Sequence, residues 1–312
     1  MDNEQQHSHL MAVIQSGLAI EKRPFLNLAR QLQTSEQSIL NTLKTWQDNG
    51  IIKRMGIIVN HNKLGYSSNA MAVWNIPDEN VDAVGEKIKL SGLASLCYRR
   101  RRHRHWPYNL FCMIHGKNRE SVEKSLQTLI NSCGLNDYPH EVLYTLRQFK
   151  QCGGQYARTN TTSEHLPTFD RAIINRLQES FPLCKEPYRA VAEELNITEV
   201  ELLQRLQALL TDKTLTRFGP MYHAGKLGGA FTLAAMAVPQ AQFDHVASIV
   251  NEFPQVAHNY ERDHRLNMWF VVATATPDEL DTTLEAIETA SGFRVFNMPK
   301  QEEFYVGLHL PA

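Results

Sequence analysis

"RPFLNLARQLQTSEQSILNTLKTWQDNGIIKRMG", residues 23–56, and "EPYRAVAEELNITEVELLQRLQALLTDKTLTRFG", residues 186–219, are two copies of one pattern. Aligned on each other, they place Pro24 on Pro187, and the similarity continues into the segments that follow. Self-similarity of this kind indicates an internal duplication. Two homologous halves in one chain usually pack as an internal pseudo-dimer, so we expect that arrangement here.

Each copy predicts a helix-turn-helix. The first helix covers residues 24–32, and Ser35, like Thr198 in the second copy, is placed to cap a second amphipathic helix with apolar residues at helical spacing. A β-rich segment follows in each copy, at residues 51–66 and 214–229, where the wing of a winged helix-turn-helix would lie.

A second domain follows each wing. The first half predicts a strand, a helix, two strands, a helix and a strand, at residues 69–77, 81–92, 94–100, 108–116, 119–134 and 141–149. This βαββαβ order is ferredoxin-like. The second half repeats it, ending in a strand at 302–310.

The predicted fold class is therefore α+β, a tandem duplication of a winged helix-turn-helix domain and a ferredoxin-like domain. The expected domains are residues 1–66, 67–160, 161–229 and 230–312, and the halves join in a polar segment near residue 160.

Composition narrows the function classes. The formal net charge of −1 gives no global attraction to nucleic acid or anionic lipid. The apolar stretches are too short to span a membrane and the polar start has no signal-peptide pattern, so we expect a cytoplasmic protein. The five cysteines form no CxxC pair, which favours reduced structural thiols over a metal site.

The domain order resembles that of the Lrp/AsnC transcription regulators, which raises the question of DNA binding. A recognition helix needs basic or amide side chains for phosphates and base edges. The second helix carries one lysine, Lys44, in the first copy, and in the second copy Arg205 with Glu199 and Glu201. Acids repel the phosphate backbone, so we expect no specific DNA binding and interpret these domains as retained for dimer-like packing.

Titratable side chains concentrate in "HNYERDHRLNMWFV", residues 258–271. If residues 256–264 are extended, one face of the strand carries four of them, because side chains alternate between faces: His258, Tyr260, Arg262 and His264. Such a row suits an anionic ligand that must be gripped and protonated.

The first half carries a related row. Tyr98 aligns with Tyr260, Arg100 with Arg262 and Arg102 with His264, and the two arginines belong to the stretch "RRRRHRH" at residues 99–105, which follows Tyr98. Several guanidinium groups together can clamp carboxylates or phosphates through paired hydrogen bonds. Arginine-rich strand ends are also common as solvated edges, but recurrence at the same place in both halves favours a binding site.

Two asparagines, Asn109 and Asn267, align at the start of the next strand. They either orient ligand groups or cap the turn, and the pattern does not decide between these roles.

At these paired motifs, "CYRRRRHRHWPYNLFCMIHG" and "HNYERDHRLNMWFVV", the sequence resembles the siroheme decarboxylases, in the fused NirDL arrangement of the two subunit types. The resemblance covers both halves. It implies removal of the carboxyl groups of two acetate side chains of siroheme, giving didecarboxysiroheme for haem d1 or an alternative route to haem b. It also implies no metal or organic cofactor beyond the iron within the substrate.

The resemblance and the chemistry together suggest roles. Loss of carbon dioxide leaves electron density on carbon that a proton must quench, and histidine is the usual donor near neutral pH. We expect His264 to donate that proton and His258 to assist or approach the iron. Arg262 would orient the departing carboxylate with a hydrogen bond from Tyr260, while Arg100 and Arg102 hold peripheral carboxylates.

The remaining substrate-binding candidates share the first-half motif or the aligned asparagines: Tyr98, Arg99, Arg101, His103, His105, Asn109 and Asn267. The stretch "RRHRH" is richer in histidine than the family pattern, so the resemblance gives His103 and His105 no specific role.

Several alternatives stay open at this point. The arginine-only face of the first half lacks an evident acid, which predicts one productive site, in the second half, acting on both acetates in succession. A haem- or siroheme-responsive regulator or carrier would use the same residue types. A C-terminal edge strand would allow a further homodimer.

Overall fold

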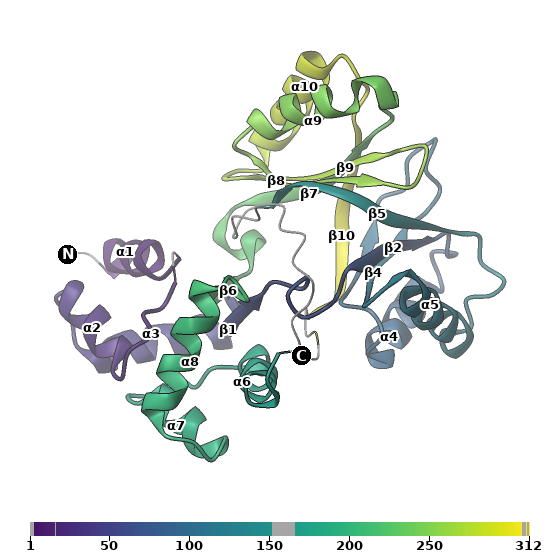
Figure 1. The fold of residues 1–312 in the computed structure, drawn as a ribbon. Coiled ribbons are helices and arrows are strands. Elements are labelled where there is room, and N and C mark those ends of the chain that lie inside the picture. The colour runs from purple at the N-terminus through teal and green to yellow at the C-terminus, as the bar shows by residue number, and fades with distance from the viewer. Residues whose placement is uncertain (1–2, 16, 152–165, 308–309, 311) are drawn as a thin grey trace. The chain divides into compact units, whose positions relative to one another are not determined.

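The computed structural model describes residues 3–15, 17–151, 166–307, 310 and 312 (Figure 1). The chain forms two compact units, each built from both halves of the sequence. One unit holds residues 1–64, 153–227 and 309–312, and the other holds residues 65–152 and 228–308. The predicted junction near residue 160 lies outside the described residues.

The first unit is helical. It contains α1 (Asn3–Gln15), α2 (Pro24–Gln31), α3 (Glu36–Asp48), α6 (Thr168–Glu179), α7 (Pro187–Glu194) and α8 (Glu199–Thr211). The predicted caps are present: Ser35 accepts from the Ser38 amide, and Thr198 forms a capping box with Glu201. Helices α1 and α6, which the sequence analysis did not predict, precede the helix-turn-helix of each half.

The predicted wings differ from the structure. Each half contributes a single strand, β1 (Ile52–Val59) or β6 (Leu215–Tyr222), and the two strands pair with each other in an antiparallel sheet. Gly56 lies opposite Gly219 in this sheet, and a Cβ on Gly56 would come within 2.5 Å of the Leu177 carbonyl oxygen. Pairing across the duplication gives each strand a hydrogen-bonded partner from the other half.

The second unit contains two βαββαβ repeats, which confirms the predicted fold class. The first repeat is β2 (Ser68–Trp74), α4 (Val81–Ser91), β3 (Leu96–Arg100), β4 (Leu110–Gly116), α5 (Arg119–Cys133) and β5 (His140–Gln151). The second is β7 (Ala230–Met236), α9 (Phe243–Glu252), β8 (Val256–Arg262), β9 (Met268–Thr274), α10 (Asp278–Ser291) and β10 (Phe296–Val306), with the 3-10 turn η2 (Gln240–Gln242) before α9. The 3-10 turn η1 (Ala224–Leu227) belongs to the first unit.

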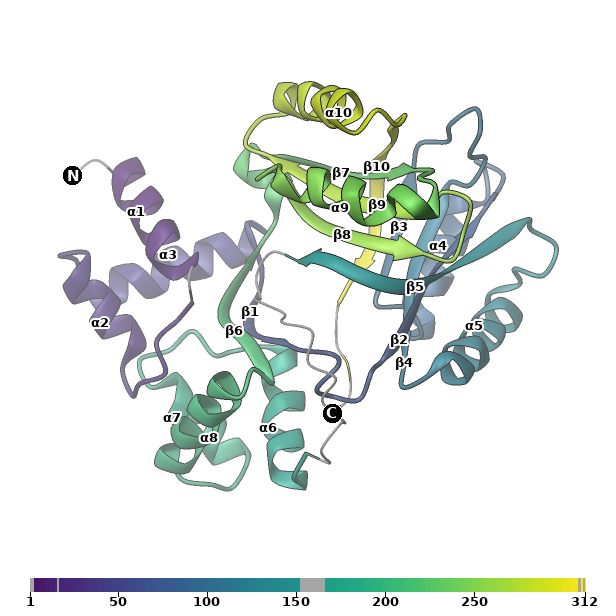
Figure 2. The same ribbon diagram turned by 45° about the horizontal axis from the view of Figure 1, so that its top comes forward.

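The two repeats close one barrel with the strand order β10-β3-β4-β2-β5-β8-β9-β7. Strand β5 of the first repeat pairs with β8 of the second, and β10 pairs with β3. Helices α9 and α10 cover the second-half strands, and α4 and α5 cover the first-half strands (Figure 2). Strand β10 pairs with β7 through residues 296–299 and with β3 through residues 300–306, which closes the barrel, so the expectation of a C-terminal edge strand is wrong.

The barrel wall separates three cores. Two lie between strands and helices, one in each repeat, and the third lies inside the barrel. The inner core includes Trp106, Tyr108, Phe111 and Trp269. Side chains that alternate with the helix-facing residues of each strand therefore point inward.

The cysteines fit the structural interpretation where they are described. Cys97, Cys112 and Cys133 are buried free thiols in the first helix–sheet core, and Cys184 is half-buried. Cys152 lies outside the described residues. Within the described ranges, no helix is both long and apolar enough to cross a membrane.

Candidate active site

Strand β8 presents the predicted row of polar side chains. His258 and Tyr260 lie on one face with ring centroids 6.2 Å apart, and the Arg262 guanidinium lies 5.4 Å from the Tyr260 ring centroid. Asn259 and Glu261 point the other way, toward the helix side, where Asn259 contacts Asn251 of α9. The alternation of a strand thus separates a binding face from a packing face.

Arg262 belongs to the inside of the barrel. Its Nη1 donates to the Leu143 carbonyl at 3.1 Å and to Asn69 Oδ1 at 3.3 Å, while its Nε has no hydrogen-bond partner among the described residues. Only 4% of the residue is exposed. This burial lowers the pKa of the Arg262 guanidinium to about 10.

Arg100 repeats this arrangement in the first half. Its Nη1 donates to the Met298 carbonyl at 2.8 Å, and its Nε likewise lacks a partner among the described residues. The guanidinium lies 5.1 Å from the Tyr98 ring centroid, and burial lowers its pKa to about 10. Burial also raises the pKa of Tyr98 to about 12. The pair Tyr98–Arg100 therefore matches Tyr260–Arg262.

His264 does not lie on the strand as predicted. Strand β8 ends at Arg262, and the His264 amide donates to the Arg262 carbonyl at 2.9 Å, which turns the chain. In that turn the Leu266 amide donates to His264 Nδ1 at 2.9 Å, and His264 Nε2 contacts Glu141 Oε2. The turn places His264 beside the inner-core residue Trp106, with ring centroids 5.4 Å apart.

His258 remains on the inner face of β8. Its Nδ1 has no hydrogen-bond partner among the described residues. Burial lowers the pKa of the imidazole, because a charged ring would lose its solvation there. His258 is thus a neutral imidazole near neutral pH.

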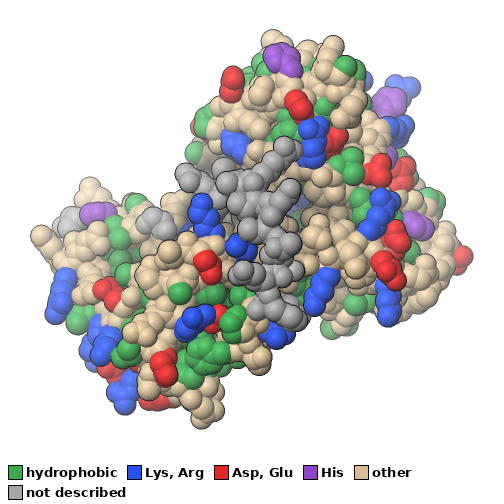
Figure 3. Space-filling view, viewed as in Figure 1, with side chains coloured by type: hydrophobic (Ala, Val, Ile, Leu, Met, Phe, Trp, Pro, Cys, Tyr) green, Lys and Arg blue, Asp and Glu red, His purple; other side chains and the backbone are tan. Residues whose placement is uncertain are grey.

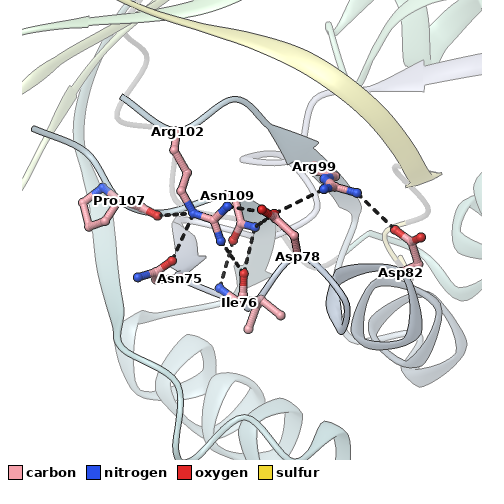
Figure 4. Close-up of polar contacts among 8 residues, drawn as sticks. All are labelled: Asn75, Ile76, Asp78, Asp82, Arg99, Arg102, Pro107 and Asn109. Carbon is pink, nitrogen blue, oxygen red and sulfur yellow. Dashed lines mark hydrogen bonds and ion pairs between the residues drawn. The ribbon is translucent and has the colours of Figure 1, made fainter. Parts of the chain in front are cut away.

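Arg102 and Arg99 are engaged in their own half, contrary to the expectation of a free arginine clamp (Figure 4). Arg102 donates to Asp78 Oδ1 at 2.7 Å, to the Pro107 carbonyl at 3.0 Å and to the Ile76 carbonyl. Arg99 pairs with Asp78 at 3.2 Å and with Asp82 at 3.5 Å. Strand β3 ends at Arg100, so Arg102 has left the strand before it could take the place that alternation predicts.

The side chains of Asn109 and Asn267 each hydrogen-bond both backbone groups of one residue. Asn109 accepts from the Ile76 amide and donates to the Ile76 carbonyl, both at 2.9 Å. Asn267 makes the same pair of bonds with Val238, at 2.9 and 2.8 Å. The hydrogen bonds support the capping alternative for both asparagines.

The other first-half candidates lie in the turn after β3. Arg101 is exposed, and its amide donates to the Pro299 carbonyl at 3.1 Å. His103 lies 5.1 Å from the Phe296 ring centroid, and burial lowers its pKa. The His105 carbonyl accepts from Arg265 at 3.1 Å, and the His105 side chain is exposed.

Sequence reasoning missed three polar side chains of this region. Tyr108 donates to Glu141 Oε1 at 2.8 Å, which joins both residues to His264. Lys300 of β10 lies 5.3 Å from the Tyr98 ring centroid. Alternation along "HEVLYT" places Glu141 on the same face as Leu143, but only closure of the barrel brings β5 beside β8.

Comparison with known proteins agrees with this architecture. The profile of the AsnC-like ligand binding domain matches residues 63–150 and 226–305, and that of the siroheme decarboxylase NirDL-like HTH domain matches residues 8–53 and 170–215. The siroheme decarboxylase NirG subunit of Stutzerimonas stutzeri is 54% identical over 143 residues, which are 46% of this chain and 97% of the subunit. The chain belongs to the siroheme decarboxylase family.

Other family members match in the same way. The siroheme decarboxylase NirL subunit of Stutzerimonas stutzeri is 41% identical over 50% of this chain and 92% of that subunit. The crystal structure of the siroheme decarboxylase NirDL covers 96% of this chain and 92% of its own, with a TM-score of 0.69 and 21% identity. These siroheme decarboxylase subunits each span about one half of this chain, whereas NirDL has the same two-half fold.

Proposed function

We propose that this protein is a siroheme decarboxylase that removes two acetate carboxyl groups from siroheme, giving didecarboxysiroheme for the synthesis of haem d1 or of haem b by an alternative route. Membership of the family supports the reaction. The buried arginines supply the physical argument.

One observation carries the proposal. Arg100 and Arg262 are each buried against the inside of the barrel, and neither pairs with an acid in the described part of the chain. A buried cation without a counter-ion is costly, and the cost falls when a carboxylate binds. Siroheme carries eight carboxylates around an apolar macrocycle, which matches two guanidinium groups set among aromatic side chains.

The second half would carry the chemistry. Arg262 orients the acetate carboxylate that leaves, and the Tyr260 hydroxyl donates a hydrogen bond to it. The C–C bond breaks, carbon dioxide leaves, and a proton from His264 forms the C–H bond of the new methyl group. His258 Nδ1, which has no hydrogen-bond partner in the described part of the chain, lies on the same face as Tyr260, where it can assist or approach the iron of the substrate.

The first half would hold the substrate without an acid of its own. Tyr98 and Arg100 match Tyr260 and Arg262, but Arg102, which aligns with His264, is held by Asp78 and by backbone carbonyls. Its guanidinium is also a permanent cation and cannot serve as a proton donor. We therefore propose one productive site that acts on both acetates in succession.

We do not propose DNA binding. Arg205, the one arginine of α8, donates from its Nε to the buried Asp170 at 2.8 Å, so its charge is compensated. Glu199 and Glu201 lie in the first turn of the same helix. In the face of the molecule that Figure 3 shows, acidic and basic side chains are interspersed over the helix-turn-helix unit.

The test is the amount of carbon dioxide released per siroheme under anaerobic conditions. The proposal predicts two equivalents, with a monodecarboxylated intermediate at early times. Tight binding of siroheme without carbon dioxide release would favour a regulator or carrier. A first-half variant that stops after one decarboxylation would contradict the single site.

A further inference from the structure

His264 is held through both of its ring nitrogens. The Leu266 amide donates to Nδ1 at 2.9 Å, and Nε2 contacts the Glu141 carboxylate. Because Nδ1 accepts a hydrogen bond, the proton of the neutral ring lies on Nε2, the nitrogen in ion-pair contact with Glu141. The side chain is 13% exposed, so few water molecules compete for these bonds.

Glu141 is itself oriented by a second partner. The Tyr108 hydroxyl donates to Oε1 at 2.8 Å, which leaves Oε2 for His264. Burial and the neighbouring Glu141 raise the pKa of Tyr108 to about 12, so the phenol remains a donor near neutral pH. Tyr108 also packs edge-on against Trp106, with ring centroids 4.9 Å apart. Glu141 therefore uses one carboxylate oxygen for the Tyr108 hydrogen bond and the other for the ion-pair contact with His264.

We propose that Glu141 and Tyr108, both from the first half, position His264 and hold its Nε2 proton, so that the proton given to the substrate is the one on Nδ1. This inference rests on the proposed decarboxylation. The proton donor His264, which belongs to the second half, then depends on Glu141 and Tyr108 of the first half for its position.

The proton balance fits this assignment. In the imidazolium both nitrogens carry hydrogen, and the carboxylate of Glu141 stabilises the positive ring through Nε2. Transfer of the Nδ1 proton to the carbon that loses carbon dioxide returns the Nε2–H form, in which Nδ1 can again accept from the Leu266 amide. Reprotonation at Nδ1 displaces the Leu266 amide and prepares the second decarboxylation.

The other charged groups near His264 have partners of their own. In the same β8–β9 connection, Arg265 donates to the His105 carbonyl at 3.1 Å and Asp263 lies 3.8 Å from Arg119. Glu141 on β5 is the acid that contacts the ring among the described residues. Removal of its charge should therefore act on His264 directly.

The first test needs no activity. Imidazole nitrogen NMR on the ¹⁵N-histidine-labelled full chain, with His264→Gln to assign the signal, should show the Nε2–H tautomer at pH 8. Glu141→Ala should shift the Nε2 signal of His264, because the contact with the carboxylate is lost. An unchanged Nε2 signal in Glu141→Ala would overturn the proposal, whether or not the protein decarboxylates siroheme.

The second test uses turnover. Glu141→Gln should lower kcat by roughly tenfold to a hundredfold, the factor that a charge-assisted hydrogen bond supplies, with KM nearly unchanged. In the pH profile of kcat, the limb that depends on the imidazolium of His264 should also move to lower pH. Tyr108→Phe should move this limb to a smaller extent. Glu79→Gln, at an exposed turn, is the matched control.

A purely structural carboxylate would give a different pattern. Glu141→Gln would then lower the melting temperature while the pH profile of kcat stayed where it is in the unsubstituted protein. That result, with normal siroheme binding, would contradict a positioning role.

Discussion

Arg100 and Arg262 occupy matching places in the two halves of the barrel, each donating one guanidinium hydrogen bond to a backbone carbonyl, of Met298 at 2.8 Å and of Leu143 at 3.1 Å. Each also lies over the tyrosine two residues before it, Tyr98 or Tyr260. Both halves of the duplication therefore contain a buried cation at the same position. Stability alone does not explain this, because buried charges are costly.

Replacing one of these arginines should separate stability from binding. Arg262→Met removes a buried charge while keeping much of the side-chain volume, so the melting temperature should be unchanged or higher. Loss of a charge-assisted contact should weaken siroheme binding by roughly 10- to 150-fold. Calorimetric unfolding and a spectroscopic titration measure the two effects. Equal affinity in Arg262→Met and the unsubstituted chain would remove Arg262 from the site.

His264→Ala should strongly lower turnover and leave siroheme binding unchanged. General acid catalysis typically contributes a factor of about 10²–10⁴, and we expect kcat to fall within that range. His245→Ala, on the exposed face of α9, is the matched control and should keep full activity. If His264→Ala turned over siroheme at the normal rate, another group would be the proton donor.

Arg102→Ala should affect stability more than catalysis. The substitution removes hydrogen bonds to Asp78 and to the carbonyls of Ile76 and Pro107, and should lower the free energy of unfolding by about 1–3 kcal/mol. The control for loss of a positive charge is Arg104→Ala, at an exposed position in the same turn. A large loss of siroheme affinity with unchanged stability would show instead that Arg102 binds the substrate.

The buried His258 predicts a specific pH dependence of stability. Burial lowers its pKa in the folded protein below the ordinary value of 6.5, so the unfolded chain takes up the proton first as pH falls. The contribution of His258 to the free energy of unfolding is constant above pH 6.5. It decreases as pH falls from 6.5 toward the folded-state pKa.

Denaturant unfolding between pH 7.5 and 5 measures this slope. His258→Gln should lose less stability across that interval than the unsubstituted chain, with His245→Gln as the exposed control. A steeper loss in His258→Gln than in the unsubstituted chain would mean that His258 is stabilised as the charged ring.

Much of the fold was predictable, because helix caps such as Ser35 and Thr198 and the period of each strand are local signals. The duplication predicted the correspondence of Tyr98 with Tyr260 and of Arg100 with Arg262. Local patterns could not show that β1 pairs with β6, since that contact depends on how the two copies meet. For the same reason, the sequence did not reveal the pairing of β10 with β7 and β3.

For the candidate site, too, local patterns predicted some positions and not others. Alternation placed His258, Tyr260 and Arg262 on one face, but the turn that follows Arg262 gives His264 its position through the Glu141 contact, which comes from a strand far away in sequence. Asp78, which binds Arg102, comes from another element of the first half, before α4. Partners of this kind decide whether a charged residue serves a ligand or the fold, and no local spacing reveals them.

The most direct measurement is the mass of the tetrapyrrole extracted after anaerobic incubation of the purified protein with siroheme. We predict didecarboxysiroheme from the unsubstituted chain, and unchanged siroheme, still bound, from His264→Ala. Recovery of siroheme with all of its carboxyl groups from the folded, unsubstituted protein would contradict the decarboxylase assignment.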